Sequence, residues 1–523
     1  LQSIPNKGVG YGILRYLSKD SSNMLKPLKE PELSFNYLGQ VDSNLSDDNL
    51  FRLSKEYTGK ELSGKTKRQI LFEINCQVLR KQFTVRIEYN QNVHDRVFVK
   101  KMAEIYLKKI SDIIENCLSD KNPEYIVSDF PLAKLDQKTL GAHFGQETNL
   151  EDIYPLSPMQ EGLLFQKLYR PDSDAYTVQN LFSVNQSIDV NKFKRAWEIL
   201  LNQHDIFRTG FKWKDLASSL QFVKKSVSLN WKEFDWRDIP IKQGQDKLNN
   251  LLLADRNADF DYDKPPLVRL YFIYLPQDQR RFIFTFHHLL IDGWCSSILF
   301  DELAHIYKRL VENKAPQLSQ KRRFKTFIEW VLNNNNEITK DFFMSYLNNA
   351  SVTNLSKIVS KQKDTTYQHY KEFENHKYAF SEEETKRFND FARAQKTTIS
   401  SLFQAAWYKT LQYLSQQDDI TFGVVLSGRS APINGIENMI GLFINTLPLR
   451  ITSNETTSVK KLLQDISEKS HQLQKLSHIP LFEVLKWIGQ TGKNKLFDTI
   501  MIFENHYNNP NSQNPKSLGL SLL

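Results

Sequence analysis

Cysteine is rare in this sequence: Cys76, Cys117 and Cys295 are the three that occur in 523 residues. So few thiols, so widely spaced, exclude a disulfide framework and a zinc site built on paired cysteines. Because free thiols are typical of reducing compartments, we expect a cytoplasmic protein, and we expect no metal.

Long apolar runs, a signal peptide and a basic cluster are missing as well. No stretch of 18 apolar residues occurs, which predicts no membrane span, and the start LQSIPNKGVG lacks the charged and apolar parts of a secretory signal. The net charge of +9 is spread over the chain, so we expect no nucleic-acid partner. Both ends look abrupt, and we expect a piece of a longer chain.

What is present is typical of a folded α/β protein. The 19 glycines and 18 prolines are too few for a fibrous or disordered chain, and 40% hydrophobic residues suffice for several cores. Apolar residues alternate across 70–90, which predicts strands, and residues 95–118 show one apolar helix face. Residues 119–150 turn polar. Beyond them helices and strands alternate to the end, which favours an α/β or α+β class with large mixed sheets.

The stretch FTFHHLLIDGWCSS at 284–297 carries the most chemical information. In strand geometry His288 shares a face with the phenylalanines before it, and His287 lies on the other face. One imidazole can therefore reach a cavity while the other packs and makes a structural hydrogen bond. Asp292 precedes a helix, where it either caps the helix or pairs with an arginine.

Other chemistries lack their motifs. A metal site on His288 and Asp292 has no third ligand, and HExxH, GxSxG, Walker and Rossmann patterns are absent. Two interpretations remain open on chemistry alone: an imidazole base in a cleft, or two satisfied core histidines.

The segment HHLLIDG at 287–293 resembles the HHxxxDG signature of condensation domains from nonribosomal peptide synthetases. Six further segments resemble the other motifs of that family, in the family's order: YPLSPMQEGLLF (154–165), HDIFRTGF (204–211), RRFKTFIEW (322–330), IGLFINTLPLR (440–450), SHIPLFEVL (477–485) and FDTIMIFEN (497–505). The resemblance covers residues 152–505.

The first part of the chain resembles the end of an epimerization domain. PNKGVGYGILRYL at 5–17 and PELSFNYLGQ at 31–40 are similar to its closing motifs, and SDFPLAKLDQ at 128–137 is similar to the connector that follows. Because the epimerization histidines would lie upstream of residue 1, we expect no epimerase activity here.

The resemblance implies two chloramphenicol-acetyltransferase-like subdomains in a V-shape, with the histidine motif in the channel between them. We expect four segments: an epimerization remnant (1–120), a linker (121–151), an N-terminal subdomain (152–335) and an incomplete C-terminal subdomain (336–523).

The implied reaction is peptide-bond formation, in which a carrier-bound peptidyl or aminoacyl thioester is transferred to the amine of a carrier-bound L-amino acid. We expect His288 to act as base or to orient the amine, and His287, Asp292 and Gly293 to shape the site. Gly293 would provide a turn that a side chain obstructs.

Four further residues are expected to shape the site. Arg208 is the first candidate for an ion pair with Asp292 and Arg429 the second. Trp294 and Asn445 are weaker candidates for lining the channel.

No carrier serine motif or adenylation motif occurs, so the resemblance implies 4′-phosphopantetheine arms presented by upstream and downstream carrier domains, with an adenylation domain in the same assembly line.

The alternatives are a stand-alone CoA-dependent acyltransferase and a catalytically silent docking module. A second epimerization domain fits DGWC at 292–295 less well, and a heterocyclizing relative would replace the histidines by a paired-Asp motif. LSPMQEG at 156–162 resembles the opening motif of domains that take D-configured donors, in agreement with an epimerase in front.

Overall fold

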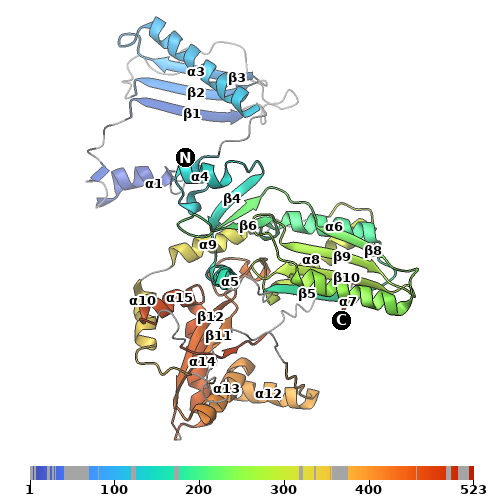
Figure 1. The fold of residues 1–523 in the computed structure, drawn as a ribbon. Coiled ribbons are helices and arrows are strands. Elements are labelled where there is room, and N and C mark those ends of the chain that lie inside the picture. The colour runs from blue at the N-terminus through green and yellow to red at the C-terminus, as the bar shows by residue number, and fades with distance from the viewer. Residues whose placement is uncertain are drawn as a thin grey trace, which may run out of the picture. The chain divides into compact units, whose positions relative to one another are not determined.

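The computed structural model divides into two units, Leu1–Pro123 and Glu124–Leu523 (Figure 1). It describes residues 4, 8–19, 24–25, 27, 29, 31–40, 70–79, 82–118, 125–169, 176–316, 322–334, 337–353, 355, 375–454, 456–490, 496–504 and 518–523. Part of the segment resembling the first epimerization motif, residues 5–7, lies outside the described residues.

The first unit contains a three-stranded sheet with one long helix. Its elements are α1 (Val9–Gly12), η2 (Ile13–Leu17), β1 (Leu33–Gln40), β2 (Phe72–Leu79), β3 (Gln82–Tyr89) and α3 (Arg96–Leu118). Strand β1 is parallel to β2, and β2 is antiparallel to β3, so that Ile74 and Ile87 share the apolar face. Helix α3 packs there, with Tyr106 Oη 3.9 Å from Cys76 Sγ. The predicted strands and helix are confirmed.

The segment expected as a linker, 121–151, is folded over the residues that the structure describes. Residues 125–150 form η4 (Val127–Asp129), η5 (Pro131–Ala133) and α4 (Gln137–Phe144). Phe130, Leu140 and Phe144 are buried in a small core with Phe222. The segment is polar on average, but its few apolar side chains point to one side and pack.

A five-stranded mixed sheet, in the order β14-β5-β10-β9-β8, forms the centre of the next part. A second sheet has the order β4-β7-β6. The elements are β4 (Leu150–Pro155), α5 (Pro158–Tyr169), β5 (Thr177–Val184), α6 (Val190–Gln203), η6 (Asp205–Arg208), β6 (Thr209–Lys212), β7 (Leu220–Lys224), β8 (Trp231–Asp235), α7 (Ile241–Asn257), β9 (Val268–Tyr274), β10 (Arg280–His287), α8 (Gly293–Val311) and α9 (Phe324–Asn333).

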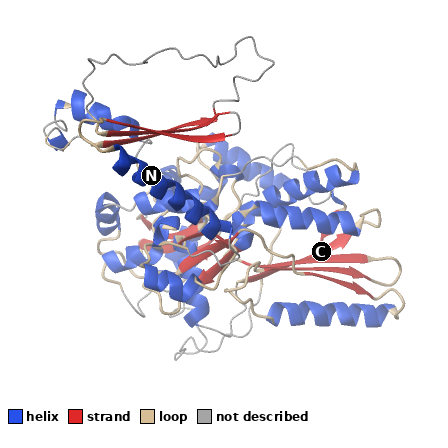
Figure 2. Ribbon diagram, turned by 90° about the horizontal axis from the view of Figure 1, so that it is seen from above, coloured by secondary structure: helices blue, strands red, loops and turns tan. Residues whose placement is uncertain are grey.

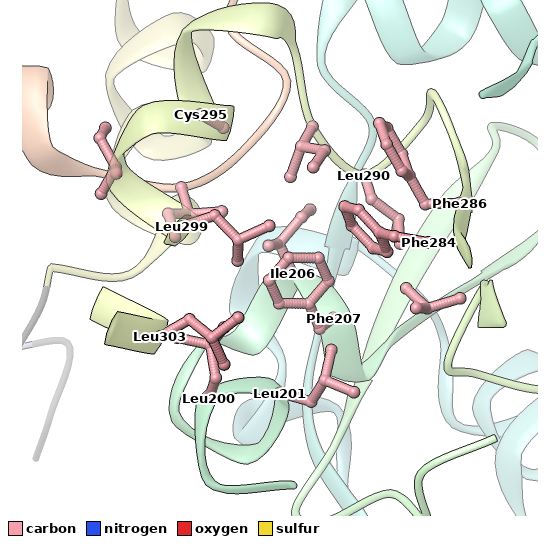
Figure 3. Packing of buried hydrophobic residues seen from close by; sticks show 14 of the residues in the cluster. Leu200, Leu201, Ile206, Phe207, Phe284, Phe286, Leu290, Cys295, Leu299 and Leu303 are labelled. Atoms are coloured by element: carbon pink, nitrogen blue, oxygen red, sulfur yellow. The ribbon is translucent and has the colours of Figure 1, made fainter. Parts of the chain in front are cut away.

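Helices cover both faces of the five-stranded sheet (Figure 2). On one face α6 and α8 pack against Phe284 and Phe286, with Leu200 and Leu299 between them (Figure 3). On the other face α7 packs through Leu248 near Ile283. The strand and helix predicted around the histidine motif are confirmed, and β10 runs through the middle of this sheet.

A second core is built on the three-stranded sheet β12-β11-β13. Its elements are α10 (Glu337–Tyr346), α12 (Glu382–Ala394), α13 (Ile399–Ser415), β11 (Asp419–Leu426), η7 (Ile436–Asn438), β12 (Asn445–Thr452), α14 (Val459–Lys475), α15 (Leu481–Trp487) and β13 (Ile500–Met501). Parallel and antiparallel strands are paired in it, as in the five-stranded sheet, so the mixed α/β class is confirmed.

The last strand, β14 (Leu520–Leu522), differs from the expected segmentation. It lies within 336–523 but pairs antiparallel with β5 of the first sheet. Leu520 is fully buried in the first core, which explains this return of the chain. Just before the strand, Gly519 has a φ of +68°, and a Cβ there would come within 2.7 Å of Asn185 Cβ.

No helix among the described residues is both long and apolar enough to cross a lipid bilayer.

Candidate active site

The histidine pair lies where β10 ends. His287 N–H donates to Leu267 O at 3.1 Å and His288 N–H to Tyr176 O at 2.8 Å, so that both backbones continue the sheet pairing. Leu290 N–H then donates to His287 O at 3.0 Å, and the chain turns toward α8. His287 is thus the last residue of β10, and His288 is the first residue of the turn.

His287 is the packed member of the pair, with 4% of its surface exposed. Leu289 N–H donates to its Nδ1 at 3.1 Å, so Nε2 carries the proton in the neutral ring and donates to Tyr262 Oη at 3.0 Å. Burial, reinforced by the neighbouring His288 and Lys167, lowers the pKa of His287 to about 3. The ring is therefore neutral, and its role is structural: it bonds the Leu289 N–H of the loop to the side chain of Tyr262.

His288 is the accessible member. It is half-buried, and its Nδ1 is shielded from solvent with no hydrogen-bond partner among the described residues. Because Nδ1 is shielded, taking a proton from a substrate or binding an amine would fall to the other ring nitrogen, Nε2.

Asp292 caps helix α8 and also binds the connection between β11 and β12. Its carboxylate accepts from Cys295 N–H at 3.3 Å and from Phe443 N–H at 3.1 Å, and Arg429 Nη2 lies 3.4 Å away. The two alternatives, cap and ion pair, are therefore both realised. The side chain is wholly buried, so this carboxylate joins the α8 end to the β11–β12 connection.

The first candidate partner of Asp292 was wrong. Arg208 instead pairs with Glu151 and donates to Lys224 O. The antiparallel pairing of β4 with β7 brings these two acceptors together beside η6.

Arg429 is held by several backbone acceptors as well as by Asp292. Its Nη1 donates to Ile436 O at 2.6 Å and to Met439 O at 2.9 Å. Its guanidinium lies 4.2 Å from the centre of the Phe443 ring. This buried cation is thus fixed before any substrate binds.

The thiol of Cys295 completes the same junction. It lies 3.1 Å from Gly441 O and 3.2 Å from Asp292 Oδ1. Burial and the nearby Asp292 carboxylate raise its pKa to about 12, so it stays protonated and is not a nucleophile.

The expected reason for Gly293 is wrong. Gly293 has no left-handed backbone, and the nearest atom to a methyl group placed on its Cα would be Glu504 Oε1 at 4.0 Å, so a side chain would not obstruct the turn.

Asn445 is 4% exposed and donates to Ser477 O at 2.8 Å and Ile479 O at 2.6 Å, so it holds a loop. Its place in a channel lining stays a prediction.

Trp294 is half-buried, and its indole N–H donates to Glu437 O at 3.1 Å. Its place in a channel lining stays a prediction.

Sequence reasoning missed two supporting residues. Tyr262 had no motif to indicate it, because its bond to His287 depends on the fold. Gln160 had a signal, since Ser157-Pro158-Met159-Gln160 has the spacing of a capping box, in which the fourth side chain bonds back to the first residue.

Among the described residues, no group of three or more His, Cys, Asp or Glu side chains could hold a metal ion.

A model of the Condensation domain family matches residues 1–135 and 150–521. The chain therefore belongs to the condensation domain family. The match covers the whole first unit and most of the second, from which residues 136–149 and 522–523 are left out.

Its relatives include much longer proteins. One subunit of the linear gramicidin synthase of Brevibacillus parabrevis is 33% identical over 511 residues, which are 97% of this chain and 6% of that protein. Bacitracin synthase 3 of Bacillus licheniformis is 28% identical over 507 residues, 97% of this chain and 8% of that protein. The chain thus spans less than a tenth of either relative.

Solved structures share the fold. The starter condensation domain of rhizomide synthetase has a TM-score of 0.55 at 17% identity, covering 67% of this chain and 78% of that one. The first condensation domain of the CDA synthetase has a TM-score of 0.55 at 13% identity, covering 68% and 83%.

Proposed function

We propose that this chain forms amide bonds as a condensation domain of a nonribosomal peptide synthetase. The observation that carries the proposal is the place of His288, a half-buried histidine that directly follows the central strand β10, next to the buried His287. Family membership and the likeness to peptide synthases support it.

In the proposed reaction the amine of an acceptor attacks the thioester carbonyl of a donor. The C–N bond forms and the C–S bond breaks, His288 accepts the proton that the amine loses, and the thiolate leaves and takes up a proton. General base catalysis of this kind is worth about 10²–10⁴-fold. Holding two tethered substrates in line contributes more where the chemistry is already downhill.

The proposed substrates arrive on partners. Both thioesters would be carried on 4′-phosphopantetheine arms of an upstream and a downstream carrier domain, with an adenylation domain in the same assembly line. We assign residues 152–335 and 336–523 to the two subdomains, with β14 contributed from the second segment to the first sheet.

We further propose a D-configured donor and an L-configured acceptor. The LSPMQEG segment at 156–162 supports it, and so does the resemblance of residues 1–120 to an epimerization domain. A chiral pocket distinguishes two hands by about 1–3 kcal/mol per misplaced group, or roughly 10–200-fold.

The histidine is tested in the intact parent synthetase by His288→Ala, with the condensed product counted. We expect product formation to fall by about 10²-fold or more. His305→Ala, an exposed histidine of α8, is the control and should leave turnover unchanged. Undiminished turnover in His288→Ala would remove this residue from the mechanism.

The donor is tested with matched D- and L-terminated thioesters on the upstream carrier and one L-aminoacyl acceptor. Equal use of both, or preference for L, would overturn the stereochemical assignment. Acyl-CoA is then offered in place of the loaded carrier. Product from acyl-CoA would favour the stand-alone acyltransferase, and absence of product with either donor would favour a silent docking module.

A further inference from the structure

The N-terminus of helix α5 is closed by a reciprocal pair of hydrogen bonds. Ser157 N–H donates to Gln160 Oε1 at 2.8 Å, and Gln160 N–H donates to Ser157 Oγ at 3.3 Å. A capping box needs only the side-chain oxygen of its last residue, and either glutamate or glutamine supplies it. The amide nitrogen of Gln160 is therefore left for another purpose.

That nitrogen reaches the histidine loop. Gln160 Nε2 donates to Leu289 O at 3.0 Å, across 129 positions of the chain. The amide cannot be turned round, because Ser157 N–H must face an acceptor and Leu289 O must face a donor. Gln160 is fully buried, so both bonds are shielded from water.

The remaining capacity of the amide is used by Gln221 of β7. Gln160 Nε2 also donates to Gln221 Oε1 at 3.3 Å, and Gln221 Nε2 donates to Gln160 Oε1 at 2.9 Å and to Pro155 O at 2.9 Å. Helix α5, strand β4 and strand β7 thus hold one amide in place, and that amide holds one carbonyl of the loop.

The bonded carbonyl directly follows His288. On the other side of Leu289 its N–H is held by His287 Nδ1 at 3.1 Å. The peptide groups around the half-buried imidazole are thereby fixed from two independent directions, by His287 and by Gln160.

We propose that Gln160 is a positioning residue, whose amide N–H fixes the Leu289 carbonyl and thereby the orientation of the His288 imidazole for acyl transfer. The catalytic part of this inference rests on the proposed function. The ordering of the loop does not.

Two variants separate the donor from the cap. Gln160→Met removes both, whereas Gln160→Glu keeps the cap oxygen and makes donation depend on protonation. A protonated carboxyl donates its O–H to Leu289 O, and an ionised one faces that carbonyl with negative charge. The activity of Gln160→Glu should therefore fall as the pH rises and the carboxyl ionises. Neither wild type nor Gln160→Met should show this fall.

Other groups titrate nearby, so each pH profile is divided by that of wild type. The titratable and charged groups on the elements packed against Gln160 are Glu161, Lys167, Glu151, Asp152, Tyr154, Lys224, His287, His288 and Asp292. Glu161 matters most, because burial and Glu483 raise its pKa to about 7, and it is present in all the variants.

The experiment measures kcat, acceptor KM and hydrogen exchange of the 287–293 amides in the intact synthetase. For Gln160→Met we expect kcat to fall about 10- to 100-fold with acceptor KM nearly unchanged, and loop exchange to quicken. Gln404→Met is the matched control. Gln404 is a buried glutamine of α13, bonded to Ser470 and Ser400, and its loss should leave kcat and loop exchange as in wild type.

Wild-type kcat and loop exchange in Gln160→Met would overturn the inference, and so would a Gln160→Glu variant whose loss is independent of pH. If Gln160→Met does not fold, the Glu variant alone decides, since it keeps the cap. If wild type itself forms no product, the proposed function fails, and loop exchange still decides whether Gln160 orders the loop.

Discussion

At the scale of single residues, Asp292 and Arg429 form a buried ion pair five positions or fewer from the histidines on the Asp292 side. The Asp292 carboxylate and the Arg429 guanidinium are almost wholly removed from water, with side-chain exposures of 0% and 4%. Desolvating two ions costs several kcal/mol each, so such a pair contributes little net stability when intact. Removing one partner is different, because the other charge then stays buried without compensation.

We therefore expect Asp292→Asn to lower the free energy of unfolding by about 3 kcal/mol, even though the amide oxygen can still cap α8. Urea denaturation checks it. Asp235→Asn, which breaks an exposed pair with Arg237, is the control and should produce no measurable change. An Asp292→Asn protein as stable as wild type would mean that the pair is not a structural tie.

The same scale predicts a pH effect from His287. Its pKa in the folded protein is about 3, below the ordinary value of about 6.5. Between those values the unfolded chain binds a proton that the folded chain does not, so stability rises with pH there and is lost as pH falls below about 6.5. His287→Asn should reduce this slope by up to about 1.4 kcal/mol per pH unit, measured by denaturation from pH 4 to 7.

Glu161→Gln is the control, because it should change the slope of stability against pH in the opposite direction. Burial raises the pKa of Glu161 from 4.5 to about 7, so the folded protein binds the extra proton and stability falls as pH rises through this range. Removing that carboxyl should steepen the upward slope. Identical slopes in both variants and wild type would contradict the two pKa shifts.

How well the sequence predicts the site depends on how far apart along the chain the interacting residues lie. The different roles of His287 and His288 followed from strand alternation, which is local. The partner of Asp292 did not, since Arg429 lies 137 positions away and meets it only because of tertiary packing. Arg208, the first candidate, pairs with Glu151 instead, which tertiary packing likewise decides.

At the scale of elements, the helices and strands with strong periodicity were predictable, and the weakly patterned ones were not. Strand β10 and helix α8 follow from a continuous apolar run and a capped apolar face. Residues 125–150 read as a linker because a few buried side chains in a polar segment barely change its composition. Strand β14, three residues long, has no periodicity to detect.

Strand β14 offers a test in which two leucines of one strand differ only in burial. Leu520 is fully buried and Leu522 is 65% exposed. Leu520→Ala should lower the free energy of unfolding by about 2–5 kcal/mol, because it leaves a cavity in the first core. Leu522→Ala should change it by less than about 0.5 kcal/mol. Equal effects in chemical denaturation would contradict the pairing of β14 with β5.

At the scale of the whole molecule, the two units differ in how much apolar surface they bury. Among the described residues of 1–123, the buried hydrophobic side chains are Ile74, Cys76 and Val99, whereas Phe35 and Tyr37 of β1 are more than half exposed. The unit 124–523 contains several separate cores. Because burial supplies most of the stabilising free energy, the first unit should open at a lower cost than the second.

We therefore expect two unfolding transitions in the 523-residue chain. All eight tryptophans lie between Trp197 and Trp487, so tryptophan fluorescence reports the second unit alone, whereas far-ultraviolet circular dichroism reports both. In urea, the circular dichroism signal should begin to fall before the fluorescence changes, because the first unit unfolds earlier. Hydrogen exchange should agree, with the amides of β2 and β3 exchanging faster than those of β10. Coincident transitions and equal protection would mean that the two units unfold as one cooperative structure.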